Sequence, residues 1–507
     1  MKNSFLYTPR NYKDIKLWKN ITEKEWNNPL WQLKNSIRTV EQLKQVISLT
    51  DYQASEIEKV VNTLRAEGKD PLRISPYYAS LIQKNPFYPK MLPGEKQESR
   101  IDPIFWQSVV TPANLLFKKA GTEQAMKEGD RSFGAAYQRY PNRVALFVAE
   151  NTSCASYCTH CQRAKSLDAE VKISTKEINK ALFYINYNTN INEVLVTGGD
   201  ALRINQNLLK YILEELSKIE HLRVIRIATR VPVVLPMAIT NSLLEMIKNS
   251  ANKHSQENEK HIYFMTHVNH YQEITKDFKK VISLINSHGF TVRNQSVLLN
   301  HVNDCYKTLA ETFRRMFWVG VHPYYLLQCH KEKGIVHFIS PIQIGEIYMK
   351  NLQGWVSGIT TPRYVANIEG GGGKVVLMPS GHDTLNLGIN IDDEVSKSFA
   401  TVNTWDNKRI EKYEALGRTT QEEYDNAVKI MDKFIGRSGV FKPRLIIVDE
   451  NGKYITTTNR DRLPKLKKIK KAELLNYELN GHGLPITNPK KHENLLNKLF
   501  EKSKFAK

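Results

Sequence analysis

From residue 144 onward the sequence alternates short apolar segments with amphipathic ones, and this alternation constrains the fold more than any other feature. The apolar segments are candidate strands at 144–149, 194–197, 224–228, 262–267, 291–298 and 324–328. The stretches between them carry apolar residues at helical spacing, and the first opens with Ser174 three residues before Glu177, a pattern typical of a helix start. Repeated strand–helix units favour a parallel sheet with right-handed crossovers. We therefore expect an α/β fold with a partial parallel (β/α)6 barrel.

The remaining residues predict two flanking regions. The chain has 507 residues, more than the roughly 250 to 300 at which a single core stops growing. Apolar residues at helical spacing predict a mainly helical N-terminal region over 1–135, followed by the barrel over 136–380. A C-terminal extension over 381–507 is predicted to be mixed and largely helical, with helices at 394–414 and 421–434 and a basic run at 465–471.

The charge balance is strongly basic, with 73 Lys and Arg against 52 Asp and Glu. Because the lysines are spread along the chain and no RNA-binding motif accompanies them, we expect a solvated basic surface rather than a nucleic-acid partner. No apolar run approaches the roughly 20 residues that span a bilayer, and the N-terminus has no signal-peptide pattern. The expected location is the cytoplasm, with no membrane partner.

Polar and glycine-rich residues follow or end each candidate strand except the fifth, where they lie within the strand. They are the cysteine loop 154–161, Gly198-Gly199-Asp200, residues 229–232, His267, residues 294–296 and Cys329-His330. Turns favour Gly, Pro and Asp, so each has a structural explanation when taken alone. Six in succession at the carboxyl ends of parallel strands predict a functional site at that rim of the barrel.

Three of the five cysteines, Cys154, Cys158 and Cys161, lie on one short loop. Their number and spacing favour metal ligation in a reducing compartment over a disulfide framework. Three thiolates can hold a four-iron cluster and leave one iron free to bind a small molecule. This spacing is typical of radical S-adenosylmethionine (SAM) enzymes. A structural zinc loop with His160 as fourth ligand, or three ordinary buried cysteines, are the alternatives.

A run of four glycines precedes Lys374. It is not a phosphate loop, because Ile368 and Val375 occupy positions where that motif requires Gly and Ser or Thr. Glycines allow the backbone to approach a ligand closely, so the run can present Lys374 for Schiff-base formation with pyridoxal phosphate (PLP). The alternative is a flexible surface loop that ends in a solvated lysine.

The ordered set of motifs closely resembles the lysine 2,3-aminomutase family of PLP-dependent radical SAM enzymes. The resemblance covers roughly residues 20 to 380. The matching stretches are 31–38, 74–78, 139–143, the cysteine loop, 198–202, 230–236, 266–270, 294–299, 322–325 and the glycine run with Lys374.

The resemblance implies a role for each matching residue. Cys154, Cys158 and Cys161 would bind a [4Fe-4S] cluster, and Lys374 would bind PLP as an imine. Arg139, Tyr140 and Arg143 would hold the PLP phosphate, a role that suits guanidinium forks. The SAM pocket would include Gly198, Gly199, Asp200, His267 and Gln295. Arg163 would hold the substrate α-carboxylate.

The implied activity is that of an isomerase, a 2,3-aminomutase. A 5′-deoxyadenosyl radical from SAM removes hydrogen from the substrate β-carbon, and the amino group then migrates from the α-carbon to the β-carbon. The resemblance further implies an electron donor such as flavodoxin or ferredoxin, and a homo-oligomer. Clostridial-type members hold a structural zinc through a cysteine at the position of Cys305 and cysteines near the C-terminus. This chain has no cysteine after Cys329, so we expect that zinc to be absent.

Two departures bear on the substrate. Lysine-specific members carry aspartates at the positions of His330 and Asn367, and without these counter-charges a desolvated ammonium costs several kcal/mol. Glutamate-specific relatives carry a basic residue and Asn there, so a glutamate-type substrate is favoured, with His330 or Lys331 meeting its side-chain carboxylate. The alternatives are another polar amino acid, lysine, a lysine within a protein partner, and a non-enzymatic basic iron–sulfur or zinc scaffold that binds nucleic acid.

Overall fold

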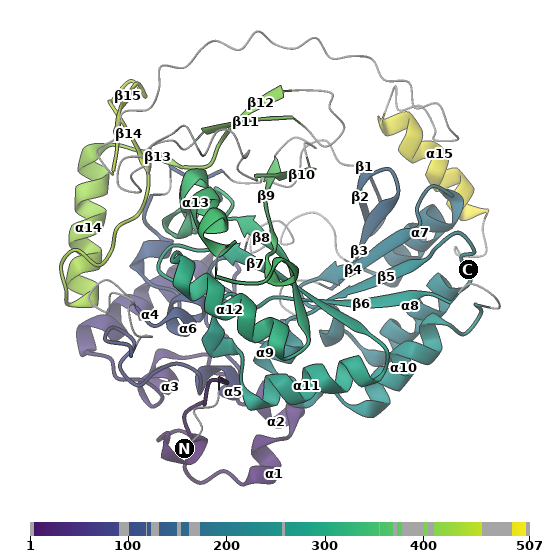
Figure 1. Cartoon of the computed structure of the whole chain (residues 1–507), viewed down its shortest axis with the longest axis horizontal. Helices are drawn as coiled ribbons and strands as arrows, with labels where there is room; N and C mark the ends of the chain where they lie inside the picture. The colour runs from purple at the N-terminus through teal and green to yellow at the C-terminus, as the bar shows by residue number, and fades with distance from the viewer. Residues whose placement is uncertain are drawn as a thin grey trace.

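The computed structural model describes residues 5–90, 101–117, 119–122, 131–149, 154–161, 173–255, 259–353, 355–368, 373–377, 399–403, 410–458 and 489–502. Its centre is a ten-stranded sheet whose strands follow one another in chain order (Figure 1). The strands are β1 (Arg131–Phe133), β2 (Ala136–Tyr140), β3 (Arg143–Ala149), β4 (Glu193–Gly198), β5 (Val224–Ala228), β6 (His261–Thr266), β7 (Thr291–Leu298), β8 (Val321–Gln328), β9 (Arg363–Ile368) and β10 (Gly373–Val376).

Strands β3 to β9 are parallel to their neighbours, and antiparallel pairings flank them at β1–β2–β3 and β9–β10. The six strands predicted from the sequence correspond to β3 to β8, which confirms the partial parallel barrel. The sequence did not reveal β9, although every residue of that strand after the first is buried. Pro362 before it and the glycine run after it made the segment resemble a loop.

The glycine run connects two strands of the same sheet and does not follow the barrel as a separate loop. Asn367 and Ile368 end β9, Gly373 and Lys374 begin β10, and the register pairs Lys374 with Asn367. Gly373 adopts a φ of +70°, which favours glycine over any residue with a Cβ. Lys374 therefore has a fixed neighbour on β9.

Helices cover the outer face of the sheet and form the ring seen in Figure 1. They are α7 (Thr175–Tyr187), α8 (Gln206–Ser217), α9 (Val231–Val234), α10 (Asn241–Ala251), α11 (Lys276–Ser287), α12 (Tyr306–Trp318) and α13 (Ile342–Leu352). Ser174 caps α7 by accepting a hydrogen bond from the Glu177 amide at 3.3 Å, as its sequence predicts. Helix α8 buries Leu209, Leu213 and Leu216 against the sheet side, and each such side chain contributes about 1.5 to 3 kcal/mol.

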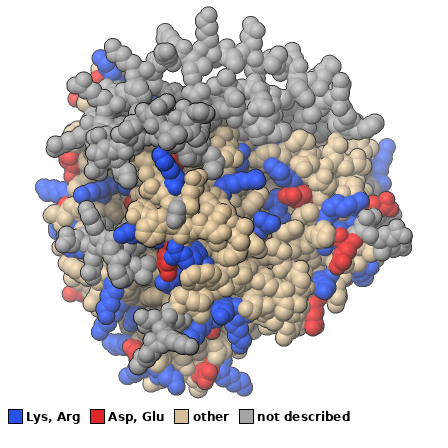
Figure 2. All heavy atoms as spheres, viewed as in Figure 1, with Lys and Arg blue, Asp and Glu red and all other residues tan. Residues whose placement is uncertain are grey.

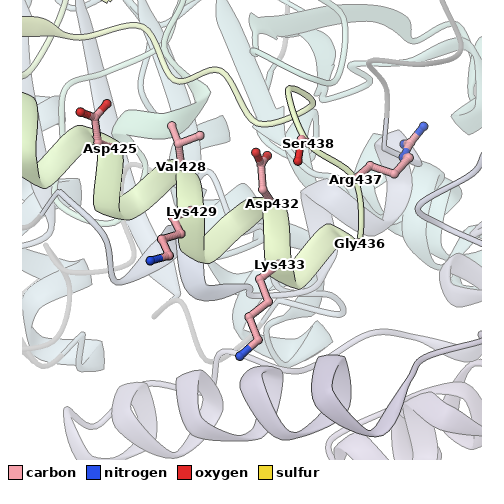
Figure 3. A pocket seen from close by; sticks show the side chains of 8 residues that line it. All are labelled: Asp425, Val428, Lys429, Asp432, Lys433, Gly436, Arg437 and Ser438. Carbon is pink, nitrogen blue, oxygen red and sulfur yellow. The ribbon is translucent and has the colours of Figure 1, made fainter.

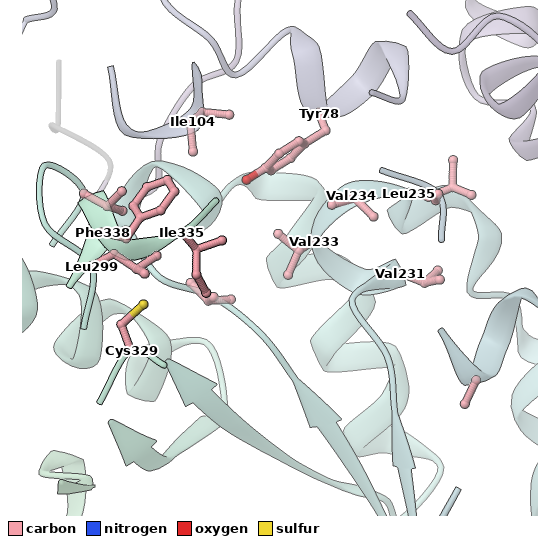
Figure 4. Packing of buried hydrophobic residues seen from close by; sticks show 14 of the residues in the cluster. Tyr78, Ile104, Val231, Val233, Val234, Leu235, Leu299, Cys329, Ile335 and Phe338 are labelled. Atoms are coloured by element: carbon pink, nitrogen blue, oxygen red, sulfur yellow. The ribbon is translucent and has the colours of Figure 1, made fainter. Parts of the chain in front are cut away.

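The N-terminal elements are helical and pack below the barrel. They are α1 (Glu23–Trp26), α2 (Pro29–Lys34), α3 (Val40–Lys44), α4 (Asp51–Ala66), α5 (Pro76–Ala79) and α6 (Pro103–Ser108). Figure 4 shows Tyr78 of α5 and Ile104 of α6 directed toward barrel residues that include Val233 and Phe338. These four side chains are almost fully buried. The N-terminal region thus shares a core with the barrel.

Short 3-10 helices connect the larger elements. They are η1 (Tyr12–Asp14), η3 (Pro112–Asn114), η5 (Ala201–Arg203), η6 (Pro236–Ala238), η7 (Tyr271–Glu273), η8 (Val336–Phe338) and η9 (Gly358–Thr360).

The C-terminal region differs from the sequence prediction in one element. The helix expected over 394–414 is wrong, because β11 (Phe399–Asn403) and β12 (Ile410–Glu414) form an antiparallel hairpin there. The helix expected over 421–434 is confirmed as α14 (Gln421–Ile435). The other elements are β13 (Arg418–Thr419), β14 (Ile446–Val448), β15 (Tyr454–Thr457) and α15 (Pro489–Glu501). The basic run at 465–471 lies outside the described residues.

The C-terminal region docks on both other regions. Phe434 of α14 meets Phe87 edge to face at 5.5 Å between ring centroids. Phe441 stacks on His301 at 6.3 Å, and the Asn300 side chain donates to the Lys442 carbonyl at 3.2 Å. Among the helices that the structure describes, none has the length and apolar character needed to cross a membrane. Figure 2 shows Lys and Arg dispersed over the described part of one face, with Asp and Glu among them.

Candidate functional site

The cysteine loop is fixed by backbone and side-chain bonds to the N-terminal region. The Tyr157 amide donates to the Arg73 carbonyl at 2.7 Å, and the Ser75 amide donates to the Ser156 hydroxyl at 3.0 Å. Thr159 bonds through its amide to the Gln107 carbonyl and through its hydroxyl to the Trp106 carbonyl. These bonds to the N-terminal region fix the position of the loop, as a ligand-bearing loop requires.

The pKa of the Cys154 thiol depends on burial and on the charges around it. Burial raises the pKa of the Cys154 thiol, and the nearby Asp200 carboxylate, Cys161 and Cys158 raise it further, while the Arg73 charge opposes them. Three thiols on one loop beside cationic side chains are a soft donor set that fits an iron–sulfur cluster. Among the described residues, no three His, Cys, Asp or Glu side chains converge on a single-ion site.

Gly198 and Gly199 make the close contact between β3 and β4. Gly198 has a φ of +143°, and a Cβ built on it would lie 2.3 Å from the Ala149 carbonyl oxygen. The Gly199 amide donates to the same oxygen at 3.0 Å. A larger residue at Gly198 would displace the end of β3, from which the cysteine loop departs.

Asp200 ties the rim of β4 to the rim of β5. Its buried carboxylate accepts from the Thr229 hydroxyl at 2.7 Å and from the Arg230 amide at 2.8 Å. It also accepts from the Leu202 amide at 3.0 Å. Burial raises the Asp200 pKa and these bonds oppose the rise. The Asp200 carboxylate thus accepts hydrogen bonds from three protein groups. Its bond to the Arg230 amide orients the segment that begins at Arg230.

His267, just after the end of β6, meets Gln295 within β7. The His267 Nδ1 lies 2.8 Å from the Gln295 carbonyl oxygen, and its Nε2 lies 3.0 Å from His160 Nε2 and 3.0 Å from the Asn269 amide nitrogen. Burial lowers the pKa of His267 to about 4, with the Arg230 charge contributing. Both imidazoles are therefore neutral at pH 7, since burial also lowers the pKa of His160 well below its usual value.

The residues expected to hold PLP come from the two ends of the open sheet. The Tyr140 hydroxyl of β2 accepts from the Lys374 amide of β10 at 2.7 Å. Arg139 of β2 donates to the Asn367 side-chain oxygen of β9 and, at 2.8 Å, to the Tyr137 hydroxyl. These contacts close the gap between the sheet edges and gather residues more than 220 positions apart in sequence.

The same place is strongly cationic. The Arg143 guanidinium lies 3.9 Å from the centroid of the Tyr140 ring, and the Lys374 Nζ lies 5.6 Å from that of Tyr325. Two guanidinium groups and a lysine beside tyrosine rings form a set of donors that fits the phosphate and ring of PLP.

His330 lies against this cationic group. It is 9% exposed, and burial lowers its pKa to about 4 with further lowering by the Arg139 and Lys374 charges. Asn367 is equally buried and accepts from Arg139. Lys331 points elsewhere, because its Nζ donates to the Glu414 carbonyl at 3.2 Å in the C-terminal region. Of the two basic residues considered for a substrate carboxylate, His330 is the one placed beside Arg139 and Lys374.

Comparison with known proteins decides the family. No family model matches the chain. It is 36% identical to L-lysine 2,3-aminomutase from Methanococcus maripaludis over 370 residues, 72% of this chain and 78% of that protein. It is 35% identical to the L-lysine 2,3-aminomutase of Bacillus subtilis over 75% of each chain, and 34% identical to glutamate 2,3-aminomutase from Clostridioides difficile over 71% of this chain and 78% of that protein. The chain belongs to the lysine 2,3-aminomutase family.

Solved structures give more distant likenesses. SuiB from Streptococcus suis bound to S-adenosylmethionine aligns with a TM-score of 0.32 and 16% identity over 45% of this chain and 51% of that one. A spore photoproduct lyase with bound AdoMet aligns with a TM-score of 0.28 and 12% identity over 70% and 86% of the two chains.

This aminomutase is thus an isomerase of the radical SAM class, whose family uses a [4Fe-4S] cluster, SAM and PLP. Identity alone does not separate lysine from glutamate relatives, since 34% to 36% spans both. Arg163, expected to hold the substrate carboxylate, lies outside the described residues. All the other expected site residues lie at the carboxyl rim or at the closure between β2 and β10.

Sequence reasoning missed several residues of this site. Tyr325 lies beside Lys374, and Arg230 contacts Cys158. Tyr325 and Arg230 belong to stretches that match the family, but neither has a role among those that the resemblance implies. Glu273 had no such signal, because only the fold brings it to Arg230. Tyr137 lies just outside the 139–143 stretch, although its spacing of two from Arg139 on one strand places both on the same face.

A hollow of about 490 Å³ on α14 is separate from this site (Figure 3). Its lining consists of Asp425, Val428, Lys429, Asp432, Lys433, Gly436, Arg437 and Ser438, none of them an expected site residue.

Proposed function

We propose that this aminomutase converts an L-α-amino acid with a carboxylate side chain, of the glutamate type, to the corresponding β-amino acid. The observation that supports it most is the pair of residues at the substrate end. His330 is a buried imidazole near Arg139 and Lys374, and Asn367 is an amide engaged by Arg139. Neither side chain offers a negative charge to a substrate ammonium, whereas the imidazole N–H and the Asn367 amide NH₂ can donate to a carboxylate.

The proposal assigns roles to the chain's own residues. Cys154, Cys158 and Cys161 hold the cluster, which supplies electrons for SAM cleavage. Gly198, Gly199, Asp200, His267 and Gln295 shape the SAM pocket, with Gly198 and Asp200 fixing the backbone that borders it.

At the other end of the site, Lys374 binds PLP, Arg139 and Arg143 hold its phosphate, and the Tyr140 hydroxyl fixes the Lys374 backbone. PLP supplies the group on which the amino nitrogen migrates. Arg163 holds the α-carboxylate, and burial of His330 and Asn367 keeps water from the substrate side chain.

The proposal includes partners. A low-potential one-electron donor such as flavodoxin or ferredoxin reduces the cluster, the chain forms a homo-oligomer, and the reducing cytoplasm keeps the three thiols available as ligands.

A substrate panel tests the proposal. The protein is purified without oxygen and supplied with dithionite, SAM and PLP, and β-amino products from lysine, glutamate, aspartate, glutamine and alanine are measured by mass spectrometry. We expect glutamate-type turnover to exceed lysine turnover at least tenfold. Robust turnover of lysine with none of glutamate would reject the charge argument.

A double substitution tests whether His330 and Asn367 select the substrate. His330→Asp with Asn367→Asp places two carboxylates where the distal group of the substrate lies, so lysine turnover should rise relative to glutamate. The control is His254→Asp, which changes an exposed histidine and should leave the preference unaltered. An unchanged preference in the double variant would show that these two positions do not select the substrate.

A further inference from the structure

A buried arginine contacts the middle cysteine of the loop. Arg230 follows β5 at its carboxyl end and is 9% exposed. Its Nη1 donates to the Cys158 sulfur at 2.6 Å. Its Nη2 donates to the Tyr78 hydroxyl at 2.7 Å and to Glu273 Oε1 at 2.8 Å. The guanidinium therefore links a cluster-loop sulfur to two groups outside the loop.

Those two groups are fixed themselves. Glu273 is fully buried, and its Oε2 accepts from the amides of Asn269 at 2.7 Å and His270 at 2.9 Å. The Tyr78 hydroxyl donates to Glu273 Oε1 at 2.9 Å. Asp200 holds the Arg230 backbone, so both ends of the arginine are anchored.

The guanidinium is charged in this setting. An arginine side chain stays protonated in proteins, and the buried Glu273 carboxylate lies 2.8 Å away as its counter-charge. Burial raises the pKa of Tyr78 and keeps its phenol neutral. A protonated guanidinium with a neutral phenol and a carboxylate behind it presents a fixed cationic donor to the sulfur.

Residues from two of the matching stretches and one residue just after a third converge here. Tyr78 ends the 74–78 stretch, Arg230 begins the 230–236 stretch, and Glu273 lies just after the 266–270 stretch. They come from α5, the start of α9 and η7, and Figure 4 shows Tyr78 close to the α9 residues Val233 and Val234. One contact with Cys158 gives all three residues a common function.

We infer that Arg230, held by Tyr78 and Glu273, is a positioning residue for the Cys158 sulfur and raises the reduction potential of the cluster. The inference rests on the proposed role of Cys154, Cys158 and Cys161 as cluster ligands. When a low-potential donor gives the cluster one electron, its net negative charge grows by one. A cationic hydrogen bond to a ligand sulfur stabilises that reduced form more than the oxidised form.

The test is an anaerobic redox titration of the reconstituted protein, followed by electron paramagnetic resonance of the reduced cluster, without SAM. Arg230→Met should disfavour reduction at least tenfold, which is a midpoint about 59 mV more negative for a one-electron couple. Tyr78→Phe leaves the arginine in place with one anchor fewer, so it should shift the midpoint in the same direction by less. Arg230→Lys keeps the charge without the fork and should lie between the wild type and Arg230→Met.

The matched control is Arg226→Met. Arg226 lies in the middle of β5, four residues before Arg230, and is paired with Glu193 at 2.6 Å. It should leave the midpoint unchanged.

Iron content and the circular-dichroism melt of each variant separate the outcomes. A wild type without four irons per chain would remove the cluster assignment itself. Four irons in every variant with unchanged midpoints would overturn the role of Arg230 and leave the proposed function standing. If Arg230→Met fails to hold iron, Tyr78→Phe and Arg230→Lys decide, and an unshifted midpoint in both overturns the inference. A shift that appears only with SAM present would also contradict it, because Arg230 would then act on SAM.

Discussion

In the proposed function the PLP site depends on Lys374, and the position of this lysine follows from its neighbours. It pairs with Asn367 across the β9–β10 hairpin, and its amide is held by the Tyr140 hydroxyl. The sequence indicated Lys374 through the glycine run and the family resemblance. The partner on β2 could not be predicted, because no local pattern relates residues 234 positions apart.

The Lys374→Ala variant should lose the absorbance of lysine-bound PLP and keep its cluster iron, because the cysteine loop lies on a different strand end. Tyr140→Phe removes one hydrogen bond, worth about 0.5 to 1.5 kcal/mol, so PLP affinity should fall several-fold. Visible absorbance and iron analysis report the two cofactors separately. Lys276→Ala, at an exposed position, serves as the control. PLP absorbance that survives in Lys374→Ala would remove this lysine from the assignment.

His330 should make substrate binding depend on pH. Its pKa is about 4 in the free protein because of burial and the charges of Arg139 and Lys374. Lys331 and Glu332 follow it in the chain, and Lys331 is directed to Glu414. A substrate carboxylate beside His330 raises its pKa, so binding takes up a proton.

The KM for a glutamate-type substrate should therefore rise as pH increases above about 4, the pKa of the free imidazole, toward the raised pKa of the complex, and His330→Asn should flatten the profile. Steady-state kinetics at saturating SAM and PLP measure it. A profile identical in the wild type and His330→Asn would show that His330 takes up no proton.

At the scale of elements, the sequence predicted the barrel strands best. Strands β3 to β8 are short segments rich in apolar residues and bounded by polar turns, and such segments can be recognised without knowing their partners. The hairpin of β11 and β12 could not be recognised that way. Phe399 pairs with Glu414, and Asn403 pairs with Ile410. A search for local helical spacing does not reveal which residues pair across two strands.

Gly198 joins two strand ends, so its replacement should affect both stability and the cluster. In Gly198→Ala the new Cβ would lie 2.3 Å from the Ala149 carbonyl oxygen at a φ of +143°. Strain and overpacking together predict a loss of about 2 to 5 kcal/mol and lower iron content, because the end of β3 must shift. Gly358→Ala, whose Cβ meets nothing within 4 Å, should change stability by less than about 0.5 kcal/mol. Urea unfolding of the apoprotein and iron analysis compare them, and equal losses in both variants would contradict the role of Gly198.

At the scale of the whole molecule, three regions share one core, and several buried histidines are neutral within it. Burial lowers the pKa of His337 to about 3, and those of His267 and His330 to about 4. The unfolded chain binds protons at these residues near pH 6.5, whereas the folded chain does not. Stability is therefore fully present above about pH 6.5 and falls as pH decreases toward 4.

The urea midpoint of the apoprotein should fall between pH 7 and pH 5 for this reason. His337 packs against Trp106 at 5.5 Å between ring centroids, and His337→Gln should make the fall shallower. His254→Gln, at an exposed position, should reproduce the wild-type slope. A wild-type slope in His337→Gln would mean that this histidine is not the buried neutral group described here.

The proposed function predicts that the amino group of a glutamate-type substrate moves from the α-carbon to the β-carbon of the same molecule. The most direct measurement uses glutamate carrying ¹⁵N on its α-amino group, together with unlabelled ammonium, in the anaerobic reaction with dithionite, SAM and PLP. The account predicts 3-aminopentanedioic acid that retains the ¹⁵N label, seen by mass spectrometry and NMR. No product from labelled glutamate, alongside label-retaining β-lysine from ¹⁵N-labelled lysine, would contradict it.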